Sequence, residues 1–340
     1  MINQVKKIWY NYKLSKGIKF FEKSNITTTS AYSSLRKMFV LTRGNSNDRI
    51  SAAINKRIGK YELDDQSGIL GNLSDFEIKN MIETMERDGF YIFDKLLPEN
   101  LTDELYNYGL TIPCQYLDIE TKAYSKQEVF FNPLQPISPR YQFSNSSIIN
   151  LPSIQKLLFD KSLLAFAQEY LGVRPILDLI AFWWSLPFEG KGKSEAAQMY
   201  HFDMDRIKFM KFFFYLTDVD TNNGPHCYVR GSHKHLPERL ARDGRFSDEE
   251  IIKEYGIENI VEICGKKGSI IAVDTRGFHK GKELVQSNRL IFQIEFANSM
   301  FGQNYPPLSI QIQDKDAEWM YNKYPYTYGQ IFSINRDVNN

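Results

Sequence analysis

The stretch Tyr200-His201-Phe202-Asp203 decides how the rest of the chain is interpreted. Residues two apart on a β-strand point to the same side, so a strand here turns the His201 imidazole and the Asp203 carboxylate the same way. A second imidazole, that of His279, follows 76 residues after Asp203. Two imidazoles and one carboxylate can occupy one face of an iron ion and leave its other positions open. The pattern predicts a non-haem Fe(II) site formed by His201, Asp203 and His279.

The chain around this motif is expected to form short strands separated by Gly and Pro turns. The expected strands are Ile176–Leu186, Ala196–Asp203, Lys208–Thr217, Cys227–Arg230, Val261–Ile263, Ser269–Val273 and Leu290–Phe296. No strand–helix–strand rhythm is visible among them, which favours an antiparallel sandwich or barrel. A double-sheet jelly roll is the natural candidate.

Helices are expected before these strands. Ser74-Asp-Phe-Glu77 has the pattern of a capping box, Pro98 opens a second helix, and Ser153–Leu171 has helical character. Residues 112–150 are aromatic and irregular. The expected fold class is therefore mostly β with flanking helices (α+β). We expect residues 73–300 to form the jelly-roll domain, preceded by a basic, partly helical extension (1–72) and followed by a tail packed on the domain (301–340).

Composition is compatible with a large core. The chain of 340 residues is 42% hydrophobic and 14% aromatic, and its 24 Phe and 20 Tyr favour strands. The three cysteines fit no zinc pattern, so a reducing compartment is expected. No apolar run is long enough for a membrane span, and no secretory signal is recognisable. These features predict a soluble, cytoplasmic protein.

Basic residues are concentrated at the start of the chain. Residues 1–60 hold 13 Lys and Arg against two acids, although the whole chain has a net charge of only +1. Residues 1–23 are expected to form a basic amphipathic helix that contacts an anionic membrane surface or an acidic partner, or that packs on its own acidic body. Because the body is acidic, a nucleic-acid substrate is not expected. Nothing in the sequence indicates the oligomeric state.

Four motifs follow one another along the chain: Tyr200–Asp203, Phe212–Val219, Asn223-Gly-Pro225 and Gly231-Ser-His233. Together they resemble the phytanoyl-CoA dioxygenase family of Fe(II)/2-oxoglutarate oxygenases. The resemblance extends from about Ser74 to Phe296. It implies a double-stranded β-helix, a cupin-like form of jelly roll.

The resemblance also implies a site and a reaction. His201, Asp203 and His279 would bind Fe(II), and Arg289 would pair with the distal carboxylate of the cosubstrate 2-oxoglutarate. With O2, such an enzyme hydroxylates an unactivated C–H bond of a small molecule and releases succinate and CO2. Acyl, amino-acid, natural-product and sugar-type substrates are all open. Asp203 argues against halogenating relatives, in which a small residue replaces the carboxylate.

One position departs from the family pattern. Family members often carry a hydroxyl residue two positions after the second histidine, where this chain has Gly281. Lys282 is a possible replacement donor, and an exposed lysine is the alternative.

Several other residues are candidates for the site. Trp184 is a candidate pocket residue or a core residue, and Arg206 is a candidate contact for an anionic substrate or a surface charge. His226 either faces the substrate or lies in a turn. Asp205 is a competitor of Asp203 for the metal, whereas His233 is interpreted as structural.

Two other functions are kept open. One is a non-catalytic jelly-roll protein that binds a ligand, and the other is a cupin-type metal enzyme without a keto acid. The second gives Arg289 no role.

Overall fold

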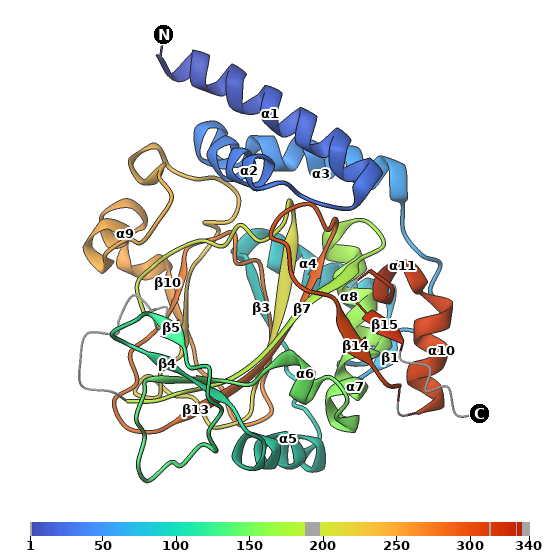
Figure 1. The fold of residues 1–340 in the computed structure, drawn as a ribbon, viewed down its shortest axis with the longest axis vertical. Helices are drawn as coiled ribbons and strands as arrows, with labels where there is room; N and C mark the ends of the chain where they lie inside the picture. The colour runs from blue at the N-terminus through green and yellow to red at the C-terminus, as the bar shows by residue number, and fades with distance from the viewer. Residues whose placement is uncertain (1, 188–197, 313, 331, 335–340) are drawn as a thin grey trace.

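The computed structural model describes residues 2–187, 198–312, 314–330 and 332–334. Its centre is an antiparallel sheet of eight strands in the order β3-β11-β8-β13-β7-β6-β4-β5. In chain order, these strands are β3 (Phe90–Ile92), β4 (Gln115–Asp118), β5 (Ala123–Tyr124), β6 (Arg140–Gln142), β7 (Ile176–Ser185), β8 (Phe209–Tyr215), β11 (Ile270–Val273) and β13 (Arg289–Ala297). Figure 1 shows the strands curving around a common centre.

A smaller sheet closes the other side. It consists of β10 (Ile260–Ile263), β9 (His226–Val229) and β12 (His279–Gly281), in that order. The two sheets face each other, because the Tyr215 hydroxyl on β8 donates a hydrogen bond to the Ile263 carbonyl on β10 at 2.8 Å. The predicted fold class, a jelly roll with flanking helices, is confirmed.

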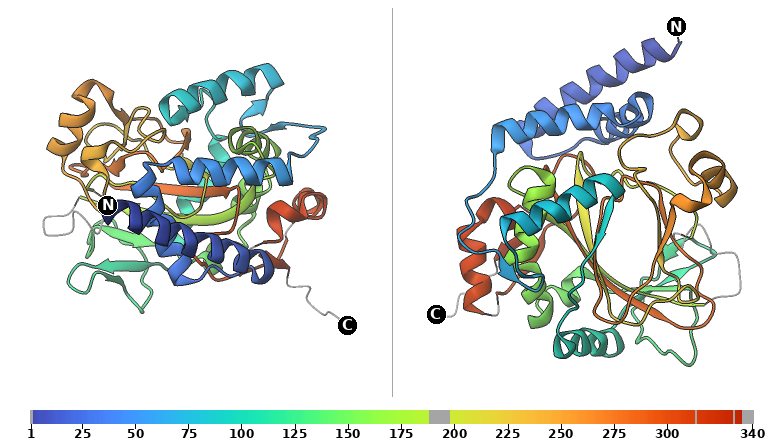
Figure 2. Two further views of the ribbon diagram at one scale, coloured as in Figure 1. Left: turned by 90° about the horizontal axis from the view of Figure 1, so that it is seen from above. Right: turned by 180° about the vertical axis from the view of Figure 1, so that it is seen from behind.

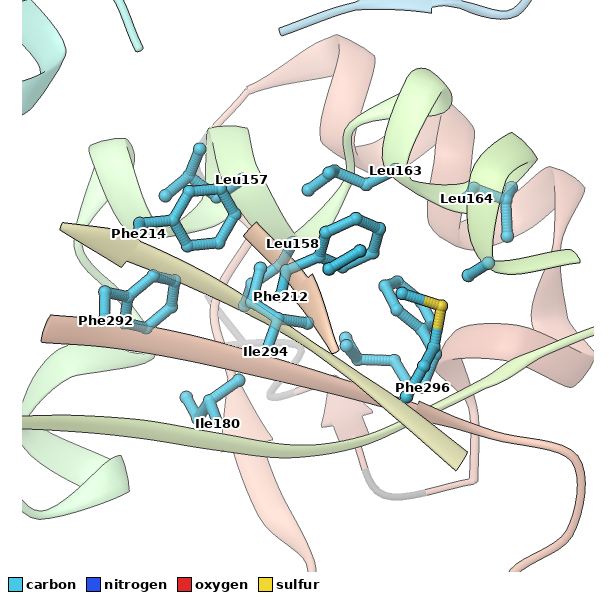
Figure 3. Packing of buried hydrophobic residues seen from close by; sticks show 14 of the residues in the cluster. Leu157, Leu158, Leu163, Leu164, Ile180, Phe212, Phe214, Phe292, Ile294 and Phe296 are labelled. Atoms are coloured by element: carbon cyan, nitrogen blue, oxygen red, sulfur yellow. The ribbon is translucent and has the colours of Figure 1, made fainter. Parts of the chain in front are cut away.

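Strand alternation divides the large sheet into two different faces. On β8 and β13, Phe212, Phe214, Phe292, Ile294 and Phe296 belong to the main hydrophobic core. Figure 3 shows these side chains packed with leucines of α7 (Pro152–Leu158) and α8 (Lys161–Leu171). The residues between them point into the barrel.

The helices before the sheet largely follow the predicted pattern. Helix α4 (Asp75–Asp88) begins with the expected capping box, in which Ser74 and Glu77 bond to each other's backbone N–H. The single helix expected over Ser153–Leu171 is wrong, because the chain breaks at Phe159–Asp160. Asp160 is the N-cap of α8, because its side chain accepts a hydrogen bond from Leu163 N at 3.0 Å. A new helix therefore begins here, and α7 does not continue into α8.

The first 60 residues form three helices, drawn in blue at the top of Figure 1. They are α1 (Ile2–Ser24), α2 (Thr29–Thr42) and α3 (Asn45–Ile58). Helix α1 packs closely on α2, and a Cβ on Gly17 would lie 2.3 Å from the Ala31 Cβ. Phe21 meets Phe301 with ring centroids 5.5 Å apart, which joins α1 to the body. The N-terminal half of α1 projects beyond the body (Figures 1 and 2).

The remaining elements lie at the edges of the barrel. They are β1 (Ser67–Gly68), β2 (Gly71–Asn72), α5 (Glu99–Thr111), α6 (Asn145–Ile148), η1 (Glu238–Leu240), α9 (Asp248–Tyr255), η2 (Ile257–Asn259), β14 (Leu308–Ile310), α10 (Lys315–Lys323), α11 (Pro325–Tyr328) and β15 (Phe332–Ile334). The chain after residue 300 contributes Met320 and Tyr328 to the main core. Among the described helices, none is both long enough and apolar enough to cross a membrane.

The strand expected over Ala196–Asp203 is not formed as predicted. Its first two residues lie outside the described ranges. In the rest of it, only Tyr200 and His201 pair, as isolated bridges to Phe246 and His279. The motif is thus an extended segment beside β12.

Candidate metal centre

Two backbone hydrogen bonds hold the segments of His201 and His279 together. His201 N donates to the His279 carbonyl at 3.0 Å, and His279 N donates to the His201 carbonyl at 2.9 Å. The two imidazoles consequently lie side by side, with ring centroids 4.3 Å apart. A bond between Asp203 N and the Thr275 carbonyl, at 2.7 Å, extends this pairing. The pairing brings together residues that are far apart in the sequence.

The outer nitrogen of each imidazole is fixed by a backbone carbonyl. His201 Nδ1 lies 2.9 Å from the Met199 carbonyl, and His279 Nδ1 lies 3.0 Å from the Gly277 carbonyl. Because a carbonyl only accepts, each Nδ1 carries the hydrogen, and each Nε2 keeps its lone pair. Burial lowers the pKa of His201 to about 3 and also lowers that of His279. Both rings are neutral near pH 7, the form in which histidine binds a metal.

The Asp203 carboxylate completes the group. Its Oδ1 lies 3.7 Å from His201 Nε2, and its Oδ2 lies 3.6 Å from His279 Nε2. The potential ligand atoms of the three residues lie within 4.8 Å of one another, and this is the one such group among the described residues. Two neutral nitrogens and one carboxylate oxygen suit Fe(II) in a three-ligand facial arrangement. The structure brings the three residues together as expected, while their role as metal ligands stays a prediction.

A buried lysine, which the sequence analysis missed, neutralises Asp203. Lys211 Nζ donates to Asp203 Oδ2 at 2.7 Å and to Asp205 Oδ2 at 3.1 Å, and lies 3.4 Å from Glu295 Oε2. Burial alone raises the pKa of Asp203, but Lys211 lowers it well below its ordinary value. The available signal was a single lysine within the apolar run of β8. Asp205 binds this lysine and lies outside the metal-ligand group, so it does not compete with Asp203.

The three side chains open into a cavity of about 190 Å³ inside the barrel. Its other lining residues are Arg140, Trp183, Lys211, Phe213, His226, Gly281, Arg289, Ile291 and Gln293. A larger hollow of about 790 Å³ lies elsewhere, between β1, α5, α8 and α10. The smaller cavity is the one that joins the potential metal ligands to Arg289.

Arg289 is buried in this cavity and has no acidic partner among the residues that the structure describes. Its Nη2 lies 3.4 Å from Ser185 Oγ, whereas its Nε and Nη1 have no hydrogen-bond partner. Burial lowers the pKa of Arg289 to about 10, and repulsion from Arg140 acts in the same direction. A buried cation without a counter-ion is costly. The geometry therefore suits an anionic ligand, as predicted for the carboxylate of 2-oxoglutarate.

Two predicted substrate residues lie outside the cavity. Trp184 points to the outer face of the large sheet, where its Nε1 donates to the Gly109 carbonyl at 2.7 Å and its ring stacks on Phe131. Its neighbour Trp183 faces the cavity instead. Arg206 is buried and bonds the Asp178 carboxylate through Nε and Nη2, both at 2.5 Å. Both placements correct the expectation of substrate contact, because neighbouring strand residues face opposite ways and because Arg206 already has an internal counter-ion.

Of the remaining candidates, His226 lines the cavity, whereas Lys282 and His233 do not. His226 lines the cavity, its Nε2 has no hydrogen-bond partner, and its ring lies 5.2 Å from that of His279. Lys282 is not among the lining residues of the cavity; it is half-buried and bonds Glu262 at 2.6 Å and Thr221 at 2.7 Å. His233 Nε2 lies 3.2 Å from the Glu86 carbonyl, outside the cavity.

The matched segment of the family model contains all three potential metal ligands. Residues 179–286 match the phytanoyl-CoA dioxygenase (PhyH) family model. The predicted resemblance to the PhyH family is thereby confirmed over these residues. Arg289 lies three residues beyond the matched segment. No sequence among the curated proteins matches the chain.

Several solved structures are similar in fold. AviO1 from Streptomyces viridochromogenes is 16% identical, with a TM-score of 0.44, over 69% of this chain and 100% of the other. EctD from S. alaskensis is 17% identical, with a TM-score of 0.48, over 73% and 86%. HygX from Streptomyces hygroscopicus, solved with nickel and 2-oxoglutarate, is 13% identical, with a TM-score of 0.46, over 72% and 94%.

Proposed function

We propose that the protein is an Fe(II)- and 2-oxoglutarate-dependent dioxygenase that hydroxylates an unactivated C–H bond of a small molecule. The observation that carries this proposal is the composition of one cavity. It holds His201, Asp203 and His279 in a group with ligand spacing. It also holds the buried cation Arg289, which forms no ion pair with any described residue. A metal and a dicarboxylate account for both features.

The chain's own residues bind and orient these groups. The carbonyls of Met199 and Gly277 hold both imidazoles with Nε2 toward Asp203. Arg289 lines the cavity with unpartnered N–H groups, and its guanidinium can donate charge-assisted hydrogen bonds to the distal carboxylate. When bound, iron supplies the oxidising chemistry with 2-oxoglutarate and O2, and succinate and CO2 are the co-products.

The inner wall limits the access of water. Phe213 packs on His226 with ring centroids 5.0 Å apart and on Trp183 at 6.3 Å. These rings reduce the hydrogen-bonding surface that the cavity wall offers to water beside the potential metal ligands. His226 is neutral, because burial and the nearby His279 lower its pKa well below the ordinary value. It can therefore contribute a hydrogen bond without adding another charge beside Arg289.

Anaerobic titration calorimetry tests the assignment. We expect the Fe(II)-loaded protein to bind 2-oxoglutarate, and we expect Arg289→Met to bind it at least tenfold more weakly. A chain that binds no 2-oxoglutarate, or that binds it equally well after Arg289→Met, contradicts the proposal.

The alternative of a non-catalytic binding protein makes a different prediction. It allows ligand binding but no succinate release, whatever small molecule is offered. Succinate-coupled turnover with a panel of acyl, amino-acid, natural-product and sugar-type compounds separates the two functions and identifies the substrate class.

A second proposal concerns the projecting half of α1, which we infer to dock on an anionic membrane surface. Its apolar patch consists of Val5, Ile8, Trp9 and Tyr12, which are 50–68% exposed. At 3.6 residues per turn, these positions lie on the face of α1 opposite its buried Leu14 and Gly17. The same exposed face continues with Lys16, Lys19 and Lys23. Apolar residues followed by lysines fit an anionic interface, where the lysines contact the headgroups.

Vesicle binding of the full-length protein tests this surface. We expect binding to vesicles with anionic lipid, weaker binding at high salt, and loss of binding in an Ile8→Asp/Tyr12→Asp variant. Phe76→Asp is the control, because Phe76 is a similarly exposed aromatic residue on α4. Equal binding to neutral vesicles, or no binding at all, would overturn the proposal, and the second result would leave an acidic protein as the remaining partner.

A further inference from the structure

Two arginines lie in one row across three strands of the large sheet. Ser185 on β7 pairs with Arg140 on β6 and with Arg289 on β13. Directly paired residues of neighbouring strands share a face, and adjacent strands lie about 4.8 Å apart. The Cα atoms of the two arginines are thus about 10 Å apart, and both side chains line the cavity of the potential metal ligands.

Arg140 is held in place by an aromatic ring and not by an acid. Its guanidinium lies over the Trp183 ring, with 4.8 Å between the guanidinium carbon and the ring centroid. Among the described residues, no carboxylate forms an ion pair with Arg140, and its buried Nε has no hydrogen-bond partner. The cation–π contact with Trp183 orients the Arg140 side chain and leaves its N–H groups available to a ligand.

The unpartnered polar atoms at this end of the cavity are nitrogens. They are Arg140 Nε, Trp183 Nε1, His226 Nε2, and Nε and Nη1 of Arg289. Two cations that repel each other across Ser185 are stabilised by an anion between them. A carboxylate, with two oxygens and about four acceptor sites, satisfies several of these donors at once.

The two positions that the family pattern suggests for a second donor, Gly281 and Lys282, do not supply one. Gly281 lines the cavity without a side chain. Lys282 is bound to Glu262 and Thr221. Arg140 is the remaining cation in the lining beside Arg289, since Lys211 is held by Asp203 and Asp205.

We propose that Arg140 and Arg289 form a two-arginine clamp on the distal carboxylate of 2-oxoglutarate, in which Arg140 supplies the contact that Gly281 cannot make. This inference rests on the proposed function. Trp183 is a positioning residue in the clamp, because it orients Arg140.

The test compares two keto acids of equal length. Binding of 2-oxoglutarate and of 2-oxopentanoate, which has a methyl group in place of the distal carboxylate, is measured anaerobically with the Fe(II)-loaded full-length protein. In Arg140→Met we expect about tenfold to a hundredfold weaker binding of 2-oxoglutarate, the range for a lost charge-assisted hydrogen bond. Binding of 2-oxopentanoate should change by less than about threefold, because that ligand lacks the clamped group.

Two controls separate the clamp from a structural role. Arg174→Met removes another arginine stacked on an aromatic ring, with 5.4 Å between its guanidinium carbon and the Tyr61 centroid, far from the cavity. It should leave both affinities unchanged. Arg140→Lys keeps the charge without the fork and should give an intermediate 2-oxoglutarate affinity.

The outcomes are distinct. If the unaltered protein binds no 2-oxoglutarate, the proposed function fails along with the clamp. If it binds 2-oxoglutarate and Arg140→Met binds it equally well, only the clamp is overturned. If Arg140→Met keeps its affinity for 2-oxoglutarate but raises KM for the oxidised substrate, the carboxylate or other anion held by Arg140 belongs to that substrate, and the clamp is again overturned.

Discussion

The two faces of the large sheet are made by the same strands but differ in chemistry. On β8, the outward Phe212 and Phe214 pack in the main core, whereas the inward Lys211 binds carboxylates. On β13, the outward Phe292 and Ile294 alternate with inward residues of the cavity. The outer face is covered by α7 and α8, as Figure 3 shows. The difference teaches that the outward face of β8 and β13 is wholly apolar, whereas their inward face combines apolar residues such as Phe213 and Ile291 with buried polar groups that need ligands.

The largest expected effect concerns the inner face. Asp203→Ala should weaken Fe(II) or Mn(II) binding by more than about a hundredfold, since loss of even an outer partner of a metal ligand costs about 10–100-fold. Asp205→Ala is the control, because Asp205 binds Lys211 but lies outside the ligand group. Anaerobic metal titration measures both, and equal losses in the two variants would contradict the assignment of Asp203.

The outer face should respond in stability alone. Phe212→Ala removes a buried ring beside Phe93 and Phe166 and should lower the free energy of unfolding by about 3–5 kcal/mol. The folded fraction should bind metal with an affinity within about twofold of the unaltered protein. Urea denaturation and metal titration give the two values. A large loss of metal affinity would show that the two faces are not independent.

Substitution of Lys211 tests how the buried carboxylates of the inner face are neutralised. Lys211→Met leaves Asp203, Asp205 and Glu295 without their shared cation. It should cost about 1–3 kcal/mol, less than a fully buried pair because both aspartate side chains are about one fifth exposed. A bound divalent cation takes over the charge at Asp203, so added Mn(II) should raise Tm more in this variant than in the unaltered protein. Lys208→Met, a buried lysine bonded to the Tyr170 carbonyl, should show no such difference.

The smallest effect compares two adjacent tryptophans. Trp184→Leu should lower the free energy of unfolding by about 2 kcal/mol without changing 2-oxoglutarate affinity. Trp183→Leu should weaken 2-oxoglutarate binding by about threefold to tenfold, because Arg140 loses the ring beneath it. Calorimetric titration measures the 2-oxoglutarate affinity of both variants, and thermal unfolding measures their stability. Identical behaviour of the two would show that strand alternation does not separate their roles.

Local patterns predicted much of the fold. The capping box at Ser74 marked the start of α4, and the apolar runs marked β7, β8, β11 and β13. The failures have local causes as well. Asp160 ended one helix and began another within a continuous helical pattern. Helix α2 was not located within the partly helical extension, because its Ser and Thr residues obscure the apolar pattern of the buried Leu35, Met38 and Phe39.

The sequence alone determined which residue types could form the metal centre and the order in which they occur. It indicated His201, Asp203 and His279 as a potential set of metal ligands, because few combinations of side chains serve one iron ion. Only the tertiary structure decided which cations are free. Arg206 is paired with Asp178, 28 residues earlier. Arg140 and Arg289 instead flank Ser185, and neither forms an ion pair with a carboxylate in the described part of the chain. The physical reason is that burial and pairing of a charge depend on strand register and on distant neighbours, which no local pattern specifies.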